Sequence, residues 1–312
     1  MHGLAHRVKF GVRIHQWEYN FDSLREIWVE ADRLGYHSAT LIDLLNAPVL
    51  ECWTTLSALV PLTHQIRLTP LVLAAPYRPP ALLAKMASTL DVISSGRLEL
   101  GLGSGGSEAD HLASGFPFPP AAVRVAQLEE ALQVIITLWQ RASPSFAGHY
   151  YTFKNAQQVP GPVQKPHPPI LIGGHGERYL MRAMARYADI ANIGFEMSLG
   201  EYARKRAVLA THCLQVGRDP TTIELSHNTR ILIAPTRIAL EERIRAEAER
   251  SGQPMEIYQA SLSRAVVGIP EECVAQLTPY VESGVRYFFM LFPHPIQISD
   301  LRLFAETVMA RL

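Results

Sequence analysis

The sequence has few cysteines, no imbalance of charge and no long apolar run. Cys52, Cys213 and Cys273 are far apart and show no CxxC spacing, so neither a disulfide framework nor a cysteine zinc site is indicated. Lys plus Arg and Asp plus Glu both number 29 among 312 residues. This balance supplies no general attraction for nucleic acid or an anionic membrane surface. No apolar run reaches the roughly 18 residues of a membrane span, and Met1–Lys9 lacks the apolar core of a signal peptide. A cytoplasmic protein is expected.

Self-contained catalytic motifs are also missing. The sequence contains no GxSxG, no HExxH and no GxxxxGK[ST] pattern, which disfavours a serine hydrolase, a metalloprotease and a P-loop NTPase. The 12 histidines show no grouping with metal-ligand spacing, so no metal site is expected.

A regular alternation of short apolar runs and amphipathic segments is what the sequence does contain. Strands are expected at residues 8–14, 38–43, 66–73, 97–103, 169–174, 189–194, 223–234 and 285–292. Helices are expected at residues 21–34, 51–63, 79–93, 121–140, 176–187, 199–216, 238–251 and 270–283. Near-continuous apolar strands that alternate with amphipathic helices indicate a parallel sheet covered on its outer face. Eight such units predict an α/β fold, a single (β/α)8 TIM-barrel domain over residues 1–312.

Two longer segments interrupt this alternation. The first insertion, about 104–120, follows the fourth strand, and the second, about 141–168, precedes the fifth strand. The second contains the aromatic stretch FAGHYYTF and several prolines, and we expect a hairpin followed by an extended arm. Long insertions at the carboxyl ends of barrel strands form the substrate mouth. For the second insertion, an arm that contacts another subunit is an equally good interpretation.

Two glycine-rich turns follow predicted strands. Residues 101–106 read GLGSGG and residues 173–176 read GGHG, the latter just before a helix. Glycine lets the backbone approach an anion closely, and the free N–H groups at a helix start attract negative charge. The two turns would lie at the same end of a barrel and could hold a phosphorylated cofactor. The alternative is that the glycines only permit tight turns.

Candidate polar groups accompany these turns. Asp43 ends the second strand among leucines and isoleucine, where a buried carboxylate needs hydrogen-bond donors, although it could equally cap the following loop. Glu108, Asp110 and His111 follow the first glycine turn, and a solvent-exposed loop is the alternative for all three. His15 and Trp17 close the first strand, where an aromatic side chain forms a wall for a planar ring or packs in the core.

Six segments in this order resemble the luciferase-like barrel oxidoreductases. They are Tyr77–Gly105, Phe116–Pro120, Gln164–Gly176, Glu177–Asn192, His212–Pro220 and Val266–Glu272. The resemblance is closest to the branch that uses the deazaflavin coenzyme F420. It implies hydride transfer between F420 and a small organic substrate, a homodimer, and a separate reductase or dehydrogenase that supplies reduced cofactor.

The resemblance also implies positions for the cofactor. Leu71 and Val72 match the backbone that lies behind the central ring, often around a non-proline cis peptide, and Asp43 matches an acidic position near the polar edge of the ring. The positions that match the cofactor tail and its phosphate are Ser104, Gly105, Gly106, Gly173, Gly174, His175, Gly176 and Glu177.

Two departures from the family pattern affect catalysis. The family frequently has a histidine after the acidic residue, where this sequence has Leu44, and relatives often have an aromatic residue where this sequence has Gly106. That histidine is the usual candidate for proton transfer to or from the substrate. Asp43 and the substitutes Glu108, His111 and His15 are therefore the catalytic candidates.

Two alternative functions remain at this point. With FMN, the same barrel acts as a monooxygenase that uses O2 and takes reduced flavin from a separate reductase. A member that only binds a ligand is the other alternative, motivated by Leu44 and Gly106.

Overall fold

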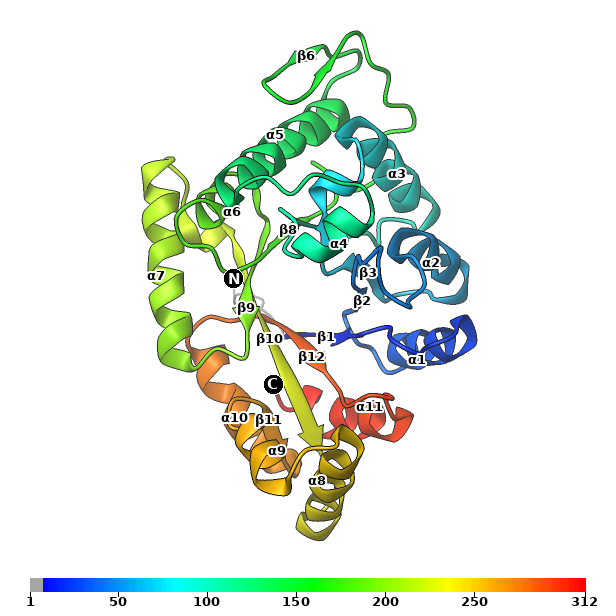
Figure 1. Ribbon diagram of the computed structural model, residues 1–312, viewed down its shortest axis with the longest axis vertical. Coiled ribbons are helices and arrows are strands. Elements are labelled where there is room, and N and C mark those ends of the chain that lie inside the picture. The colour runs from blue at the N-terminus through cyan, green and yellow to red at the C-terminus, as the bar shows by residue number, and fades with distance from the viewer. Residues whose placement is uncertain (1–7) are drawn as a thin grey trace, which may run out of the picture.

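A closed ring of parallel strands surrounded by helices forms the protein, in a computed structural model that describes residues 8–312 (Figure 1). The ring strands are β1 (Lys9–Arg13), β2 (Ser38–Leu41), β3 (Arg67–Pro70) with β4 (Leu73–Ala74), β5 (Leu100–Gly103), β8 (Ile170–Gly173), β9 (Ile190–Phe195), β10 (Glu224–Ile233) and β12 (Tyr287–Leu291). They pair in the order β3-β2-β1-β12-β10-β9-β8-β5-β4. Because β3 and β4 are parts of one strand interrupted at Leu71–Val72, the ring closes on itself. The predicted (β/α)8 fold is confirmed, with a strand at each predicted position.

The expected helices lie on the outside of the ring. They are α1 (Phe21–Arg33), α2 (Cys52–Leu59) with the 3-10 turn η1 (Val60–Leu62), α3 (Pro80–Ile93), α5 (Ala121–Gln140), α6 (Leu180–Tyr187), α7 (Leu199–Gln215), α8 (Arg237–Ser251) and α10 (Pro270–Glu282). Only α6 differs clearly from its predicted start, because residues 177–179 form a turn before it.

The prediction of one helix after each strand is wrong near the end of the chain. After β10 come α8, α9 (Met255–Ser261), the short strand β11 (Val266–Gly268) and α10, and β12 is followed by α11 (Ile298–Phe304) and the π-helical turn η4 (Ala305–Met309). β11 pairs with the end of β10 outside the ring. The helix α9 buries none of its residues, so it leaves no apolar periodicity in the sequence.

Two apolar clusters hold the barrel together. A small cluster inside the ring contains Leu71, Leu171, Ile190, Tyr287 and Phe289, all buried. The larger one lies mostly between the strands and the surrounding helices. Each of these large side chains contributes roughly 1.5–3 kcal/mol when it is fully buried, so the interior is a packed floor beneath the carboxyl ends of the strands.

The two insertions lie in different places. The first contains α4 (Glu108–Ala113), beside the carboxyl end of β5. The second forms the predicted hairpin, β6 (Phe146–Ala147) with β7 (Thr152–Phe153), which lies beyond α5 at the top of Figure 1. Its backbone is held by Glu130 of α5 and, further along, by Asp91 of α3. None of its residues lines the cavity at the carboxyl ends, so the interpretation as part of the substrate mouth is wrong, whereas the subunit-arm interpretation stays a prediction.

No helix within residues 8–312 is long and apolar enough to cross a membrane. Residues 1–7, part of the segment considered above for a signal peptide, lie outside the described residues.

Candidate active site

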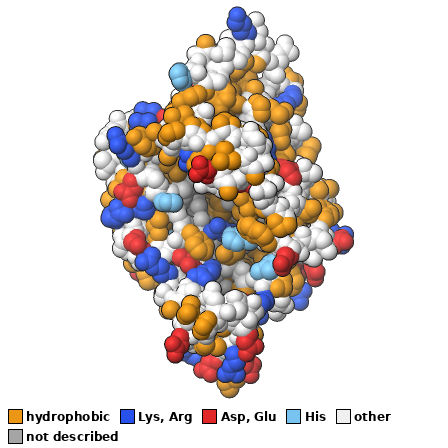
Figure 2. Space-filling model, in the orientation of Figure 1, with side chains coloured by type: hydrophobic (Ala, Val, Ile, Leu, Met, Phe, Trp, Pro, Cys, Tyr) orange, Lys and Arg blue, Asp and Glu red, His pale blue; other side chains and the backbone are white. Residues whose placement is uncertain are grey.

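A cavity of about 820 Å³ opens at the carboxyl ends of the ring strands. Its wall comes from the residues at and after the ends of β1, β2, β4, β5, β8, β9 and β10. Figure 2 shows the hollow near the middle of the face on which α4 lies. Barrel enzymes carry their active sites at this end.

The residues predicted for cofactor binding all line this cavity. They are Asp43, Leu71, Val72, Ser104, Gly105, Gly106, Gly173, Gly174, His175, Gly176 and Glu177. They come from four separate parts of the chain, and the barrel brings them together because each follows the carboxyl end of a neighbouring strand.

Leu71 and Val72 form an apolar part of the wall. The peptide bond between them is cis, as the resemblance implied. The side chain of Val72 lies against two glycines of neighbouring strands. A Cβ atom added to Gly103 would lie 2.8 Å from one Val72 γ-methyl, and one added to Gly173 would lie 2.9 Å from the other. Because both positions are glycine, the Val72 side chain has enough space between them.

The two glycine turns present unpaired backbone donors to the cavity. Gly105 has φ +78° and Gly174 has φ +139°, conformations that residues other than glycine rarely adopt. Across residues 8–312, the N–H groups of Gly105, Gly106, Gly176 and Glu177 donate no hydrogen bond. Successive free N–H groups of this kind form a concave binding site for an anion.

The charges around the second turn also suit an anion. Glu177 accepts hydrogen bonds from Lys205 and Arg204, each at 2.9 Å. These hydrogen bonds lower the pKa of the Glu177 carboxyl, whose charge is therefore balanced. Arg178 and Arg124 line the cavity as well, so the turns lie in a locally positive region of a protein without net charge.

Asp43 is buried and fully engaged. Its carboxylate accepts hydrogen bonds from Arg78 at 2.8 and 2.9 Å and from the backbone N–H of Ala74 at 3.0 Å. Arg78 also donates to Glu51 at 2.6 Å. This network connects the end of β2 to the segment after β4. It also supplies the hydrogen-bond donors that the sequence analysis expected a buried Asp43 carboxylate to need.

A second polar group centres on Tyr77, which the sequence reasoning missed, and includes Asp110 and His111, which it named. The Tyr77 hydroxyl donates to Asp110 and contacts Nδ1 of His111 at 3.1 Å. Asp110 also accepts from the backbone N–H of Asn46 at 2.6 Å. Burial and the neighbouring Asp110 raise the pKa of Tyr77, so its hydroxyl is protonated at neutral pH. Tyr77 and Asp110 line the cavity.

The structure does not bring the four catalytic candidates together. Only Asp43 lines the 820 Å³ cavity. Glu108 is exposed on α4, and His111 is fully buried with its ring against Gly105. Leu44 lines the cavity where the family frequently has a histidine.

His15 lies in a smaller neighbouring cavity of about 190 Å³, together with Tyr258 and His294. Burial, and then the positive charges of Arg13 and His294, lower the pKa of His15 to about 4. Its imidazole is therefore neutral at pH 7. Trp17 packs edge to face on His15, with ring centroids 5.4 Å apart, and does not line the larger cavity.

The wall of the cavity formed by β1, β9 and β10 contains four further residues that the sequence reasoning missed. They are Arg13, Asn192, Phe195 and Asn228. Arg13 and Phe195 are the last residues of β1 and β9, whereas Asn192 and Asn228 lie in the middle of β9 and β10. A place at the end of a barrel strand was the sequence signal that could have identified Arg13 and Phe195.

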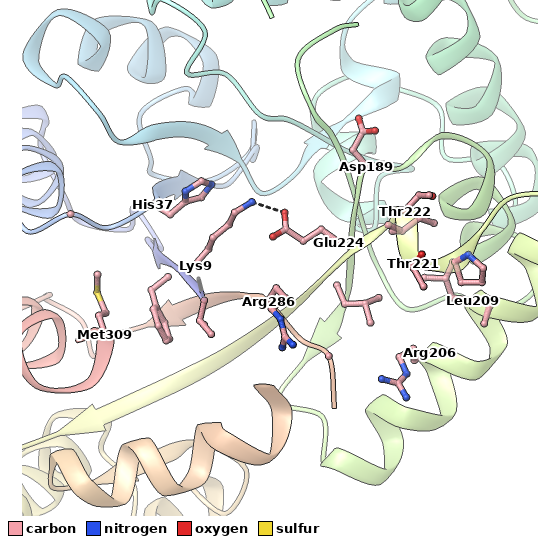
Figure 3. A pocket seen from close by; sticks show the side chains of 18 residues that line it. Lys9, His37, Asp189, Arg206, Leu209, Thr221, Thr222, Glu224, Arg286 and Met309 are labelled. Carbon is pink, nitrogen blue, oxygen red and sulfur yellow. Dashed lines mark hydrogen bonds and ion pairs between the residues drawn. The ribbon is translucent and has the colours of Figure 1, made fainter. Parts of the chain in front are cut away.

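A cavity of about 910 Å³ lies at the other end of the barrel (Figure 3). It is lined by Lys9 and Glu224, which pair at 2.8 Å, and by Val8, the first described residue. Residues at the amino-terminal face of such barrels serve stability. Within residues 8–312, no three His, Cys, Asp or Glu side chains are grouped so as to hold a metal ion.

The fold and the cavity define a (β/α)8-barrel protein with a cavity at the carboxyl ends of its strands. A family model described as luciferase-like monooxygenase matches residues 2–287, and the chain belongs to this family. The predicted family is confirmed.

Individual relatives cover nearly the whole chain. The F420-dependent glucose-6-phosphate dehydrogenase of Amycolatopsis mediterranei (strain U-32) is 26% identical over 98% of both chains. Among solved structures, the monooxygenase RslO1 from Streptomyces bottropensis has a TM-score of 0.81 and 20% identity, over 97% of this chain and 99% of that one. An F420-dependent secondary alcohol dehydrogenase in complex with an F420-acetone adduct also has a TM-score of 0.81, with 18% identity and the same coverage. The two structures confirm the fold.

Proposed function

We propose that the protein is an F420-dependent oxidoreductase that transfers a hydride between the deazaflavin ring and a small organic substrate. The observation that carries this proposal is the cavity itself, in which an apolar wall stands beside two turns with free N–H groups. The F420-dependent relative aligned over 98% of its length supports the choice of cofactor.

The residues present fit such a cofactor. The turns at Gly105 and Gly174 have a shape that a side chain would disturb, because both glycines have positive φ. An added Cβ would collide with His111 at Gly105 and with Leu180 at Gly174. In our assignment the two turns hold the anionic tail, and Leu71 and Val72 support one face of the ring. When bound, the ring accepts or gives up the hydride.

The chain itself positions groups and handles a proton. Asp43, fixed by Arg78 and Ala74, presents a negative charge near the polar edge of the ring. For proton transfer we propose the pair Tyr77 and Asp110, because both line the cavity and share a hydrogen bond. His111 then supports this pair, and His15 and Glu108 are the alternatives.

Titration of the purified protein with F420 and with FMN, followed by fluorescence, tests the choice of cofactor. We expect saturable binding of F420 and much weaker binding of FMN. Tight FMN binding without F420 binding would instead establish the flavin monooxygenase. That alternative is favoured by the description of the family and by the similarity to RslO1. Binding of neither compound would favour the alternative of a non-catalytic family member that binds another ligand. Leu44 and Gly106, the two departures from the family pattern, motivate that alternative.

We also propose that the protein works in the cytoplasm as a homodimer and that a separate dehydrogenase or reductase supplies the reduced cofactor. The balanced charge and the absence of a membrane-crossing helix within residues 8–312 support a protein free in solution. The exposed apolar side chains of Val159 and Val163 on the arm are candidates for the subunit contact. Light scattering coupled to size exclusion, with Val159→Asp as the variant, tests the dimer.

A further inference from the structure

Arg13 is a charged group that lines the cavity and has no ion-pair partner among residues 8–312. It ends β1, and it makes no hydrogen bond or ion pair to any of residues 8–312, while its Nε and Nη1 atoms are shielded from solvent. The ring of Phe195 lies against the guanidinium group, with its centroid 4.8 Å from the guanidinium carbon. An unpaired buried charge is costly, which suggests a partner supplied by a ligand.

Other partly buried arginines of the barrel do have partners. Arg78 pairs with Asp43 and Glu51, and Arg230 pairs with Glu196 at 2.6 and 2.9 Å. Glu196 is the acidic group whose charge acts on Arg13, and it is already used by Arg230. The guanidinium of Arg13 therefore does not complete an ion pair of the fold.

The surroundings of Arg13 define what it would bind. Asn192 and Asn228 lie on the same wall, and their amides pair with each other at 2.7 and 3.1 Å, so both are neutral and engaged. The local charge is a single positive one. If the ring lies against Leu71 and Val72, as the proposed function holds, the part of the cavity that Arg13 lines is left for the substrate.

We propose that Arg13 binds the carboxylate of a monocarboxylate substrate, with the face of Phe195 against the apolar part of the same molecule. One guanidinium balances one carboxylate, whereas a phosphate monoester would bring a second negative charge that nothing on this wall neutralises. The other cations that line the cavity, Arg124 and Arg178, lie at the turns assigned to the cofactor tail. The assignment goes beyond the cofactor and names the class of substrate.

The test uses the full-length protein without cofactor and three carboxylate probes, namely acetate, pyruvate and benzoate. Calorimetric titration compares each carboxylate with its amide. We expect at least one carboxylate to bind better than its amide. Arg13→Met should weaken that binding by roughly tenfold or more, and Arg13→Lys should restore part of it. The matched control is Arg25→Met, an exposed arginine on α1.

Equal binding of carboxylates and amides, or unchanged carboxylate binding by Arg13→Met, would each overturn the proposal. Arg13→Gln, checked for its fold by circular dichroism, replaces Arg13→Met if the latter does not fold. A separate F420 titration of the same variants distinguishes the two proposals. Loss of F420 binding with normal carboxylate binding would place Arg13 at the ring instead, and absence of F420 binding by the native protein would overturn only the proposed function.

Discussion

The Asp43 carboxylate holds the segment after β4 in place. Its partners are Arg78 and the backbone of Ala74, and its side chain is 1% exposed. Asp43→Ala leaves Arg78 buried with only Glu51, and breaking a buried ion pair costs about 3–5 kcal/mol. We expect a loss of unfolding free energy of this size in urea denaturation. We also expect F420 affinity to fall.

The control for this variant is Glu18→Ala, because the side chain of Glu18 is 83% exposed. Its unfolding free energy should change by no more than about 0.5 kcal/mol. If Asp43→Ala were as stable as the control and bound F420 normally, Asp43 would have to be removed from the candidate site.

His227 makes the stability of the barrel depend on pH. It is buried between Tyr280, on which it stacks at 4.8 Å, and Tyr202, and burial lowers its pKa to about 4. The unfolded chain takes up the proton near pH 6.5 and the folded chain only near pH 4. The stabilisation is therefore present above pH 6.5 and is lost as the pH falls to 4. The difference corresponds to about 3 kcal/mol.

His227→Phe keeps an aromatic ring in this cluster and removes the titration. Urea denaturation at several pH values should show a smaller loss of unfolding free energy between pH 6.5 and 4 than in the native protein. Part of the loss should remain, because the pKa of His15 is also lowered to about 4. His64→Gln, at an exposed position, is the control. An unchanged pH profile in His227→Phe would contradict the prediction.

The residues of the candidate site differ in how far they could be predicted from the sequence. The tight turns at Gly105 and Gly174 could be predicted, because residues other than glycine rarely adopt a positive φ. Arg13 and Tyr77 could not, because an arginine at a strand end and a tyrosine before a helix have many ordinary uses. Their roles depend on which partners they lack or meet in three dimensions.

At the scale of elements, the turn between β8 and α6 is the part most sensitive to substitution. A β-branched residue at Gly174 must adopt φ +139°, and its Cβ would collide with Leu180. Gly174→Val should therefore abolish F420 binding in a fluorescence titration. Gly200→Ala is the control, because Gly200 lies in α7 with no atom within 4 Å of an added Cβ. Unchanged affinity in Gly174→Val would remove the phosphate assignment from this turn.

Within the second insertion, the β6–β7 hairpin is held to α5 by one carboxylate. Glu130 accepts hydrogen bonds from the backbone N–H groups of His149, Tyr150 and Tyr151 at 3.0, 2.8 and 2.7 Å. Glu130→Ala should release the hairpin and cost about 1.5–3 kcal/mol, the range for hydrogen bonds to a charged group. Trypsin cleavage after Lys154 should become faster, whereas F420 affinity should stay the same, because the hairpin is remote from the cavity.

Glu242→Ala, an exposed position on α8, is the control for this variant. A loss of F420 affinity in Glu130→Ala would show that the arm acts on the site after all. The hairpin itself could be predicted from its aromatic residues, but its place could not. A loop between a helix and the next strand leaves the barrel at the end opposite the site, and local pattern does not show where it then packs.

For the whole molecule, the periodicity of the sequence predicts the ring strands because they are buried on both faces. The additional elements α9, β11 and α11 could not be predicted from this periodicity. Each is short, and β11 is a strand only because β10 extends beyond the ring and offers an edge, with Ile231 opposite Val266. Such pairing depends on the closed barrel and is not encoded in the local pattern.

Ligand binding should stabilise the barrel as a whole, because the proposed site joins β2, β4, β5 and β8, which are strands distant in the sequence. A ligand at about 100 times its Kd adds about 2.7 kcal/mol to the unfolding free energy. For a chain of this length that corresponds to a rise in Tm of about 5 °C. Differential scanning fluorimetry with F420 should show this rise, FMN should give less, and Gly174→Val should give none. A rise of equal size in Gly174→Val would mean that F420 binds elsewhere, because the turn that forms the proposed phosphate site would then be dispensable.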